Sequence, residues 1–265
     1  MLSPCVSASS RIRARTATRR SATGRTSSSA LLASRGVNRR FGTAPPHGTA
    51  DTKRLAQWLV LVGLLALLAY GSRIGAGKPD PQVLYRWSTA VGGLVQDAIV
   101  LALVLAVARG ASPLLGLRLP RSVWRSVLFV AAAVVRVILF EAVYSGLVHP
   151  GNEQGLTPDR WEPAHATAYI VNAIVICTWV PFVEELTYRG LGYSLLERFG
   201  RGWAILGVGI LFGLAHGLVL SLPVIVAFGC ALAWVRAETD SVLPGMVAHS
   251  VFNAVALIAA VTIGS

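Results

Sequence analysis

The stretch Val183–Arg189, with the sequence VEELTYR, places ionisable residues inside an otherwise apolar segment. That segment, residues 166–190, is long enough to cross a bilayer, which takes about 20 residues. Ionisable side chains in hydrocarbon cost about 2.5–3.5 kcal/mol each on insertion scales, so they usually mark function. On a helix, Glu185 and Arg189 are i and i+4 neighbours that can pair, whereas Glu184 points about 100° away. Glu184 is then free for general-base chemistry, unless all three residues form a solvated helix end.

The rest of the chain also consists largely of apolar segments. Of its 265 residues, 54% are apolar and 14% are charged, whereas a soluble domain carries roughly 25% charged residues. We therefore expect an all-α fold, a polytopic membrane helix bundle with about seven transmembrane helices. The predicted helices, of which the sixth is the shortest, cover residues 55–72, 89–108, 123–147, 166–190, 203–220, 222–236 and 242–262.

Composition divides the chain into three parts. Residues 1–54 form a basic N-terminal tail, residues 55–165 hold the first transmembrane helices and loops, and residues 166–262 hold the later transmembrane segments with the clusters of ionisable residues. The first 50 residues are rich in Arg and Ser and contain no acidic residue. This composition is typical of an organelle transit peptide and equally of a disordered basic tail. We favour the disordered tail.

The net charge of +12 does not indicate a nucleic-acid partner, because nearly half of the Lys and Arg residues lie in the first 54 positions. Basic flanks of membrane segments are topology signals, and a cytoplasmic N-terminus places most other loop arginines inside. The loop 148–165 would lie outside, and it is mainly acidic. Arginine greatly outnumbers lysine, which is typical of a GC-rich genome. We therefore expect a multi-pass protein of a bacterial cell membrane with its N-terminus in the cytoplasm.

Two further polar clusters lie in later apolar segments. Phe212 and His216 are one helical turn apart, as are His249 and Asn253. A lone His on an apolar helix is more often a hydrogen-bonded packing residue than a catalyst, and Phe212 alone indicates core. His249 and Asn253 can donate hydrogen bonds in the same direction and so hold an oxyanion. The alternative is a polar clamp between helices, as membrane proteins often use.

Helix geometry predicts that the three clusters meet. Glu184 lies sixteen residues before Gly200 and His216 sixteen residues after it. In an antiparallel hairpin that turns at Gly200, both residues lie about 24 Å from the turn. His249 starts from the same end and reaches this height if the hairpin projects about 12 Å beyond the membrane. Residues from three helices can therefore form one site.

These motifs, EExxxR, FxxxH and HxxxN in this order, resemble those of the CPBP intramembrane proteases, also called Abi or CAAX-protease-like. The resemblance covers about residues 166–262. It implies an endopeptidase in which Glu184 and His216 activate water while His249 and Asn253 stabilise the oxyanion, with Glu185, Arg189 and Phe212 in support. The family was first described as metalloproteases, and a metal-free glutamate mechanism is the competing view. If zinc is present, its ligands would be Glu184, His216 and His249.

The same resemblance implies a peptide or membrane-anchored protein as substrate, with membrane lipids as the other partner. We expect the substrate to enter from the membrane or its cytoplasmic face. Two other functions remain open. Buried Glu and His also mark the ion pathways of transporters and proton-coupled carriers, and a non-catalytic immunity or assembly factor could use the same scaffold.

Other ionisable residues in the apolar segments carry weaker signals. Asp97, Arg136 and Glu141 could gate or bind substrate, but structural polar contacts are the expected role. Tyr188 lies one turn beyond Glu184, within hydrogen-bonding reach of it. Cys5, Cys177 and Cys230 are isolated, so they indicate neither a disulfide framework nor a zinc ribbon.

Overall fold

The computed structural model describes residues 49–77, 80–153, 155–156, 158 and 161–263, which belong to one compact unit, Ala44–Ser265. Most of the predicted tail, residues 1–48 with Cys5, lies outside the described residues. Over the described ranges the chain forms seven helices and no strand, when Pro163–Phe199 is taken as one continuous helix. The predicted all-α fold is therefore confirmed.

The helices agree closely with the predicted segments. They are α1 (Thr49–Gly71), α2 (Trp87–Val107), α3 (Val123–Val148), a long helix over Pro163–Phe199, α7 (Arg201–Leu214), α8 (Leu222–Thr239) and α9 (Leu243–Ile263). Short 3₁₀ turns cover Val83–Tyr85, Ser112–Leu115, Pro163–His165 and Glu197–Phe199. Among the described residues, six helices are long and apolar enough to cross a membrane. The chain is a multi-pass integral membrane protein.

The fifth predicted span is the exception. Residues 203–220 were expected to be helical throughout, but α7 ends at Leu214 and has 14 residues, about 21 Å of helix against a hydrocarbon core of about 30 Å. Gly217 takes a left-handed conformation with φ of 63°, and a Cβ atom there would lie 2.7 Å from the Ala69 backbone. The residues after this turn are still apolar, so hydropathy alone could not locate the helix end. The sixth span is longer than predicted, with 18 residues.

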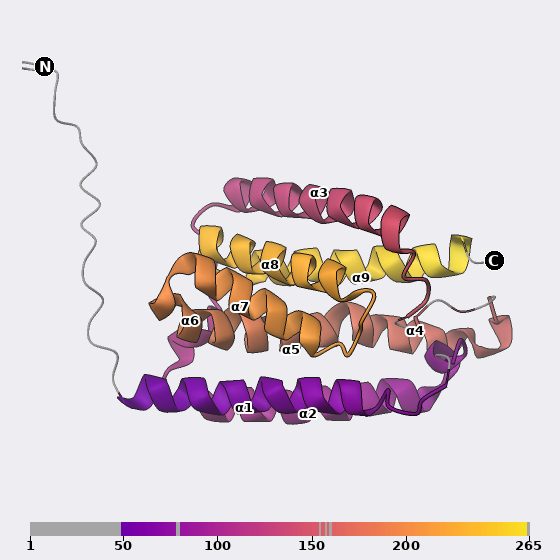
Figure 1. Cartoon of the computed structure of the whole chain (residues 1–265), viewed down its shortest axis with the longest axis horizontal. Coiled ribbons are helices and arrows are strands. Elements are labelled where there is room, and N and C mark those ends of the chain that lie inside the picture. Colours follow the sequence, from indigo (N-terminus) through magenta and orange to yellow (C-terminus); the bar gives the residue numbers. More distant parts are fainter. Residues whose placement is uncertain (1–48, 78–79, 154, 157, 159–160, 264–265) are drawn as a thin grey trace, which may run out of the picture. The chain divides into compact units, whose positions relative to one another are not determined.

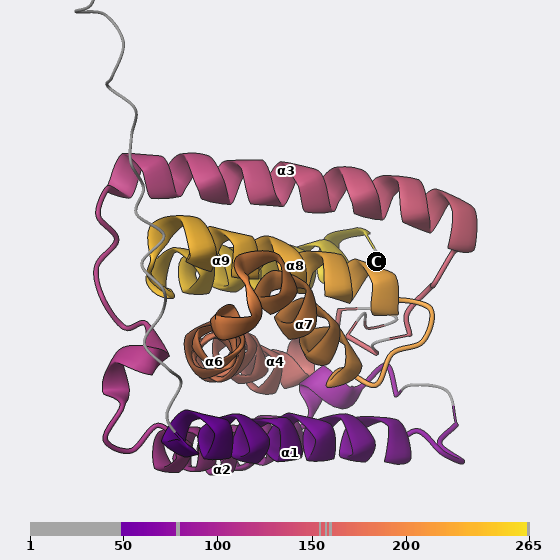
Figure 2. The ribbon, with the colours of Figure 1, turned by 60° about the vertical axis from the view of Figure 1, so that its left-hand side comes forward.

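The helices form layers. Figures 1 and 2 show α3 on one side of the bundle, α1 and α2 on the opposite side, and α7, α8, α9 and the long helix between them. Helix α8 packs against both α3 and α7. Residues that face inward from the long helix, α7 and α9 are therefore shielded on both sides.

The long helix contains two π-helical segments. It contains α4 (Ala166–Ile174), a π-helical segment (Val175–Trp179), α5 (Val180–Glu184), a second π-helical segment (Glu185–Gly192) and α6 (Tyr193–Leu196). The π-helical winding is rare and is found frequently at functional sites. Here the second π segment begins inside the sequence motif that contains the two glutamates.

Helix α1 is fixed against the second π segment through one tryptophan. Trp58 is fully buried, and its Nε1 donates a hydrogen bond to the Thr187 carbonyl oxygen at 2.9 Å. A Cβ atom at Gly192 would lie only 2.2 Å from Cζ2 of Trp58. The close contact therefore requires glycine at position 192.

The bundle has two chemically different ends. We call the first the basic end. There, arginine side chains donate hydrogen bonds that join the start of α1 and the turns after α2, α6 and α8 to one another; these arginines are Arg54, Arg118, Arg198 and Arg201. At the second, which we call the Glu153 end, the Glu153 carboxylate accepts backbone hydrogen bonds from Val219, Leu220 and Ser221 at 2.7–3.1 Å. The Tyr70 hydroxyl donates to the Leu218 carbonyl oxygen at this end.

Candidate active site

Glu185 is the buried anchor of the site. Its Oε1 accepts a hydrogen bond from Arg189 Nη1 at 2.8 Å, and the two side chains are 1% and 0% exposed. Arg189 also donates through Nη2 to the Gly229 carbonyl oxygen of α8 at 3.1 Å. The predicted i, i+4 pair is therefore confirmed, and these two residues do not belong to a solvated helix end.

His249 of α9 lies between the two glutamates. Its Nδ1 is 3.0 Å from Glu185 Oε1, and its Nε2 is 3.6 Å from Glu184 Oε2. The ring itself is buried, whereas the Glu184 side chain is 23% exposed. Nδ1 donates to the Glu185 carboxylate, so Nε2 can donate to a further acceptor only when the ring carries both protons.

His216 lies immediately beyond the end of α7, and its orientation is set by the backbone. Its Nδ1 lies 2.8 Å from the Phe212 carbonyl oxygen, an acceptor, so Nδ1 carries the proton. Nε2 of the neutral ring is then free to accept a proton. The early end of α7 places His216 in the walls of the two cavities described below.

Asn253 is part of a clamp between helices. Its Nδ2 donates a hydrogen bond to the Ile176 carbonyl oxygen at 2.9 Å, and Ile176 belongs to the first π segment. One amide hydrogen is thus engaged, and the second remains for another acceptor. Both alternatives for the His249 and Asn253 motif, a clamp and an oxyanion donor, are compatible with this geometry.

Phe212 lies at the centre of the aromatic cluster that supports these groups. The Arg189 guanidinium carbon lies 4.2 Å from the centroid of the Phe212 ring. The rings of Tyr188, His216 and His249 lie 5.3, 4.6 and 6.0 Å from it. Phe212 is therefore core, as its sequence context indicated, but its ring contacts three of the motif residues.

Two cavities meet at His216. The first, which we call the glutamate cavity, has a volume of about 540 Å³ and is lined by Glu184, Tyr188, His216 and residues of α1 and α2. The second, which we call the histidine cavity, has a volume of about 590 Å³ and is lined by His216, His249, Asn253 and residues of α3 and α8. The 3.6 Å contact between Glu184 and His249 joins the two sides. The junction thus brings Glu184, His216 and His249 together, and Asn253 lies in the wall of the histidine cavity.

The site does not fit a bound metal ion in its present arrangement. Both histidines hold Nδ1 in a hydrogen bond, as zinc-ligating histidines usually do. Among the described residues, however, no three His, Cys, Asp or Glu side chains are grouped closely enough to hold a metal ion. Glu184, His216 and His249 therefore do not form a ready zinc site.

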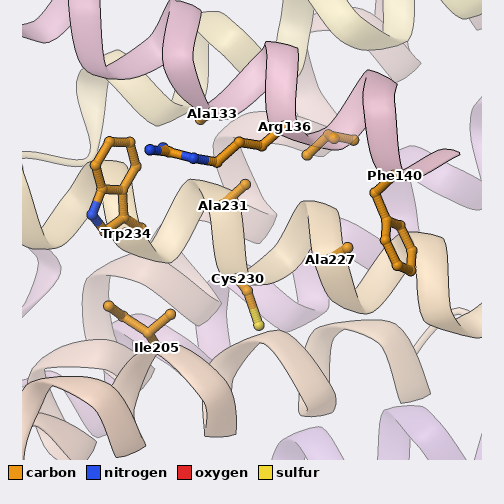
Figure 3. A pocket seen from close by; sticks show the side chains of 9 residues that line it. Ala133, Arg136, Phe140, Ile205, Ala227, Cys230, Ala231 and Trp234 are labelled. Carbon is orange, nitrogen blue, oxygen red and sulfur yellow. The ribbon is translucent and has the colours of Figure 1, made fainter. Parts of the chain in front are cut away.

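Two of the other ionisable residues in the apolar segments line the cavities, and Arg136 does not. Asp97 lines the glutamate cavity and Glu141 lines the histidine cavity. Arg136 lies away from both, in a groove of about 490 Å³ between α3, α7 and α8, with its guanidinium carbon 4.7 Å from the Trp234 ring centroid (Figure 3). The Tyr188 hydroxyl has no hydrogen-bond partner among the described residues, so the bond to Glu184 that its position suggested is not formed.

Sequence reasoning missed several features of the site. The winding of the π segments and the role of the Ile176 carbonyl leave no signal in residue type. A Cβ atom at Gly245 would lie 3.0 Å from Glu185 Oε2, and this glycine stood in no motif. The hydrogen bonds that the Glu153 carboxylate accepts from Val219, Leu220 and Ser221, which we call the Glu153 latch, join loops that are far apart in sequence. Acidic loop residues are common, and so are helices that begin with a pair such as Leu222-Pro223. Neither pattern identifies Glu153 as the partner of the turn before α8.

The fold and the cluster define a class: a multi-pass integral membrane protein that buries carboxylate and imidazole groups between its helices. Residues 165–255 match the model of a protein family that is described as 'Type II CAAX prenyl endopeptidase Rce1-like'. Residues 165–255 are therefore an Rce1-like domain of the CPBP type, as the sequence motifs predicted. The match contains every motif residue from Glu184 to Asn253. No curated protein and no solved structure matches the chain.

Proposed function

We propose that this protein is an intramembrane endopeptidase that hydrolyses a peptide bond with water activated by Glu184. The observation that carries the proposal is the junction of the two cavities, where Glu184 lies 3.6 Å from His249 and His216 lines both sides. The family match supports a protease over a carrier. We assign the catalytic part to residues 166–262, with residues 55–165 as the covering helices.

In the proposed first step, Glu184 removes a proton from a water molecule at the junction. His216 Nε2 is the second available acceptor because its Nδ1–H is committed to the Phe212 carbonyl oxygen. The water oxygen attacks the peptide carbonyl carbon, and the carbonyl oxygen becomes an oxyanion. His249 in its doubly protonated form and the free amide hydrogen of Asn253 would donate to it, which is the arrangement of an oxyanion hole.

In the second step, the carbon–nitrogen bond breaks and the nitrogen leaves as an amine. The proton that Glu184 holds goes to this nitrogen, so the carboxylate is regenerated. Glu185 and Arg189 have a positioning role. Their buried pair fixes Nδ1 of His249 and therefore the direction in which Nε2 points.

The substrate is proposed to be a membrane-anchored or lipid-modified peptide, because the histidine cavity has mainly apolar walls. Both cavities extend to the Glu153 end: Ser72 and Arg73 line one, and His149 to Asn152 line the other. Residues of the basic end line neither. We therefore propose that the substrate enters from the membrane or at the Glu153 end.

With a cytoplasmic N-terminus, this proposed route differs from the cytoplasmic face, which the sequence suggested as one of two points of entry. Six of the described arginines lie at the basic end, together with the start of α1: Arg109, Arg118, Arg121, Arg198, Arg201 and Arg236. By the positive-inside rule this end faces the cytoplasm. The Glu153 end then faces the opposite side of the membrane, and the substrate would be taken from there.

The proposal is tested with purified protein in liposomes that contain membrane-anchored reporter peptides. We expect endoproteolytic cleavage, with one oxygen-18 atom from labelled water in each new carboxyl group. Because the three candidate ligands are not grouped as a metal site, activity should survive exhaustive chelation. Loss of activity that zinc restores would contradict the metal-free mechanism. Ion flux across the liposome without any cleavage would favour a carrier instead.

A further inference from the structure

The glutamate cavity holds two polar groups that the proposed mechanism does not use. Asp97 of α2 has one carboxylate oxygen, Oδ2, that is buried and has no hydrogen-bond partner among the described residues. The Tyr188 hydroxyl is also buried and has no hydrogen-bond partner among the described residues, and Tyr188 is only 3% exposed. Both side chains line the cavity that Glu184 lines.

Such groups need a partner that the protein does not supply. A buried polar atom without a hydrogen bond costs roughly 1–3 kcal/mol, and buried polar groups in native proteins are almost always paired with protein or water. A buried water needs polar partners and room for at least one molecule. The glutamate cavity offers about 540 Å³, so space for several molecules is present.

The two cavities also differ in their walls. The glutamate cavity is additionally lined by Ser72, Arg73 and Gln96, which supply donors and acceptors from α1 and α2. The histidine cavity is lined mainly by apolar side chains of α8 and α9, such as Val224, Phe252 and Leu257. Water is favoured in the first cavity, and an apolar peptide chain is favoured in the second.

We propose that the glutamate cavity is the water chamber of the enzyme, and that Asp97 and Tyr188 position the water that Glu184 activates. The Asp97 carboxylate accepts a hydrogen bond from this water, and the Tyr188 hydroxyl donates one to it. The peptide lies across His216 in the histidine cavity, so water and substrate reach the junction from opposite sides. This inference rests on the proposed peptidase function and adds two positioning residues to it.

The first test separates catalysis from structure by steady-state kinetics of the full-length protein in liposomes. Asp97→Asn and Tyr188→Phe should each lower kcat about tenfold to a hundredfold and leave KM within about twofold, because the substrate site is untouched. A purely structural role predicts a different result for Tyr188→Phe. Removal of an unpartnered hydroxyl should then leave kcat unchanged and the fold equally or more stable. Asp51→Asn, at the exposed start of α1, is the control and should match the wild type.

The second test needs no catalysis. In a variant that lacks the native cysteines, Gln96→Cys should react with a small charged thiol reagent, because Gln96 lines the chamber. Ile99→Cys is the matched control: it lies on the same helix and is 57% exposed on its outer surface, where lipid should protect it. Equal reactivity of the two, or an unreactive Gln96→Cys, would overturn the inference.

The outcomes separate the two claims. If Asp97→Asn and Tyr188→Phe keep the wild-type kcat while Glu184→Gln is inactive, the water chamber is wrong and the peptidase stands. If Glu184→Gln keeps full activity, the proposed function itself fails. If Asp97→Asn does not fold, Tyr188→Phe and the cysteine pair still decide the question.

Discussion

Glu185 and His249 share a buried hydrogen bond of 3.0 Å between Oε1 and Nδ1, which joins the second π segment to α9. The same oxygen accepts the bond from Arg189. One carboxylate thus neutralises a guanidinium and fixes an imidazole. In the proposed mechanism Glu185 acts indirectly, because it fixes the His249 nitrogen that faces Glu184.

Replacement of Glu185 should therefore affect folding before chemistry. Glu185→Ala leaves Arg189 buried without its counter-charge, which typically costs about 3–5 kcal/mol. We expect a strong loss of thermal stability in detergent, measured by the unfolding midpoint of the purified protein. Glu238→Gln removes an ion pair at the basic end and should change the midpoint little. Wild-type stability of Glu185→Ala would contradict the buried cluster.

Glycine at position 192 tests the packing of α1 against the π segment. Gly192→Ala would bring a Cβ atom to 2.2 Å from the Trp58 ring, and overpacking of this kind costs typically about 1–3 kcal/mol. Gly63→Ala, in α1 with nothing within 4 Å, is the matched control. It should be neutral or stabilising by up to about 1 kcal/mol, because alanine is the better helix former. Equal unfolding midpoints for the two variants would show that α1 does not pack as described.

The Glu153 latch predicts a pH dependence. Burial alone would raise the pKa of Glu153, but hydrogen bonds from the backbone N–H groups of Val219, Ser221 and Leu220 hold that pKa below its usual value. Its stabilising contribution is therefore complete above the unfolded pKa of about 4.3 and disappears as the pH falls through the lower folded pKa. Proteolysis of the loop 149–156 should accelerate over that acidic range.

Glu153→Gln is the control for the latch. A neutral amide binds the three N–H groups less strongly, so the loop should be cleaved faster at neutral pH, and cleavage should lose its acidic dependence. If the wild type and Glu153→Gln show the same pH profile, the latch does not control the loop.

The orientation of the bundle is open to direct measurement. With a cytoplasmic N-terminus, Ser112→Cys, in the turn after α2 at the basic end, should react with a membrane-impermeant thiol reagent only from the cytoplasmic side. Asn152→Cys, in the loop at the Glu153 end, should react only from the opposite side. The reversed pattern would place substrate access in the cytoplasm and show that the arginines do not set the topology.

The sequence predicted the helices and the meeting of the motifs for a simple reason. Hydropathy reports burial in lipid directly, and the equal spacing of Glu184 and His216 from Gly200 fixes their height in a hairpin. Pairing of Glu185 with Arg189 follows from helix geometry alone. These inferences need only local periodicity and one turn.

The remaining features depend on contacts between segments that are distant in sequence. The end of α7 is set by the Gly217 turn against Ala69, and an apolar sequence continues past it. The fit of Gly192 against Trp58 and the division into two cavities depend on how helices pack. Asp97 could be recognised as an ionisable residue in a membrane segment, but only the fold places it in the cavity of Glu184.

The central claim is that the Glu184 carboxylate activates water at the junction of the cavities, and Glu184→Gln tests it most directly. The amide keeps the size of the side chain but cannot act as a base, so cleavage of a membrane-anchored peptide should fall by about 10²–10⁴-fold. The unfolding midpoint should stay near that of the wild type, because this side chain lies partly open to the cavity. Cleavage at the wild-type rate by a correctly folded Glu184→Gln protein would contradict the account.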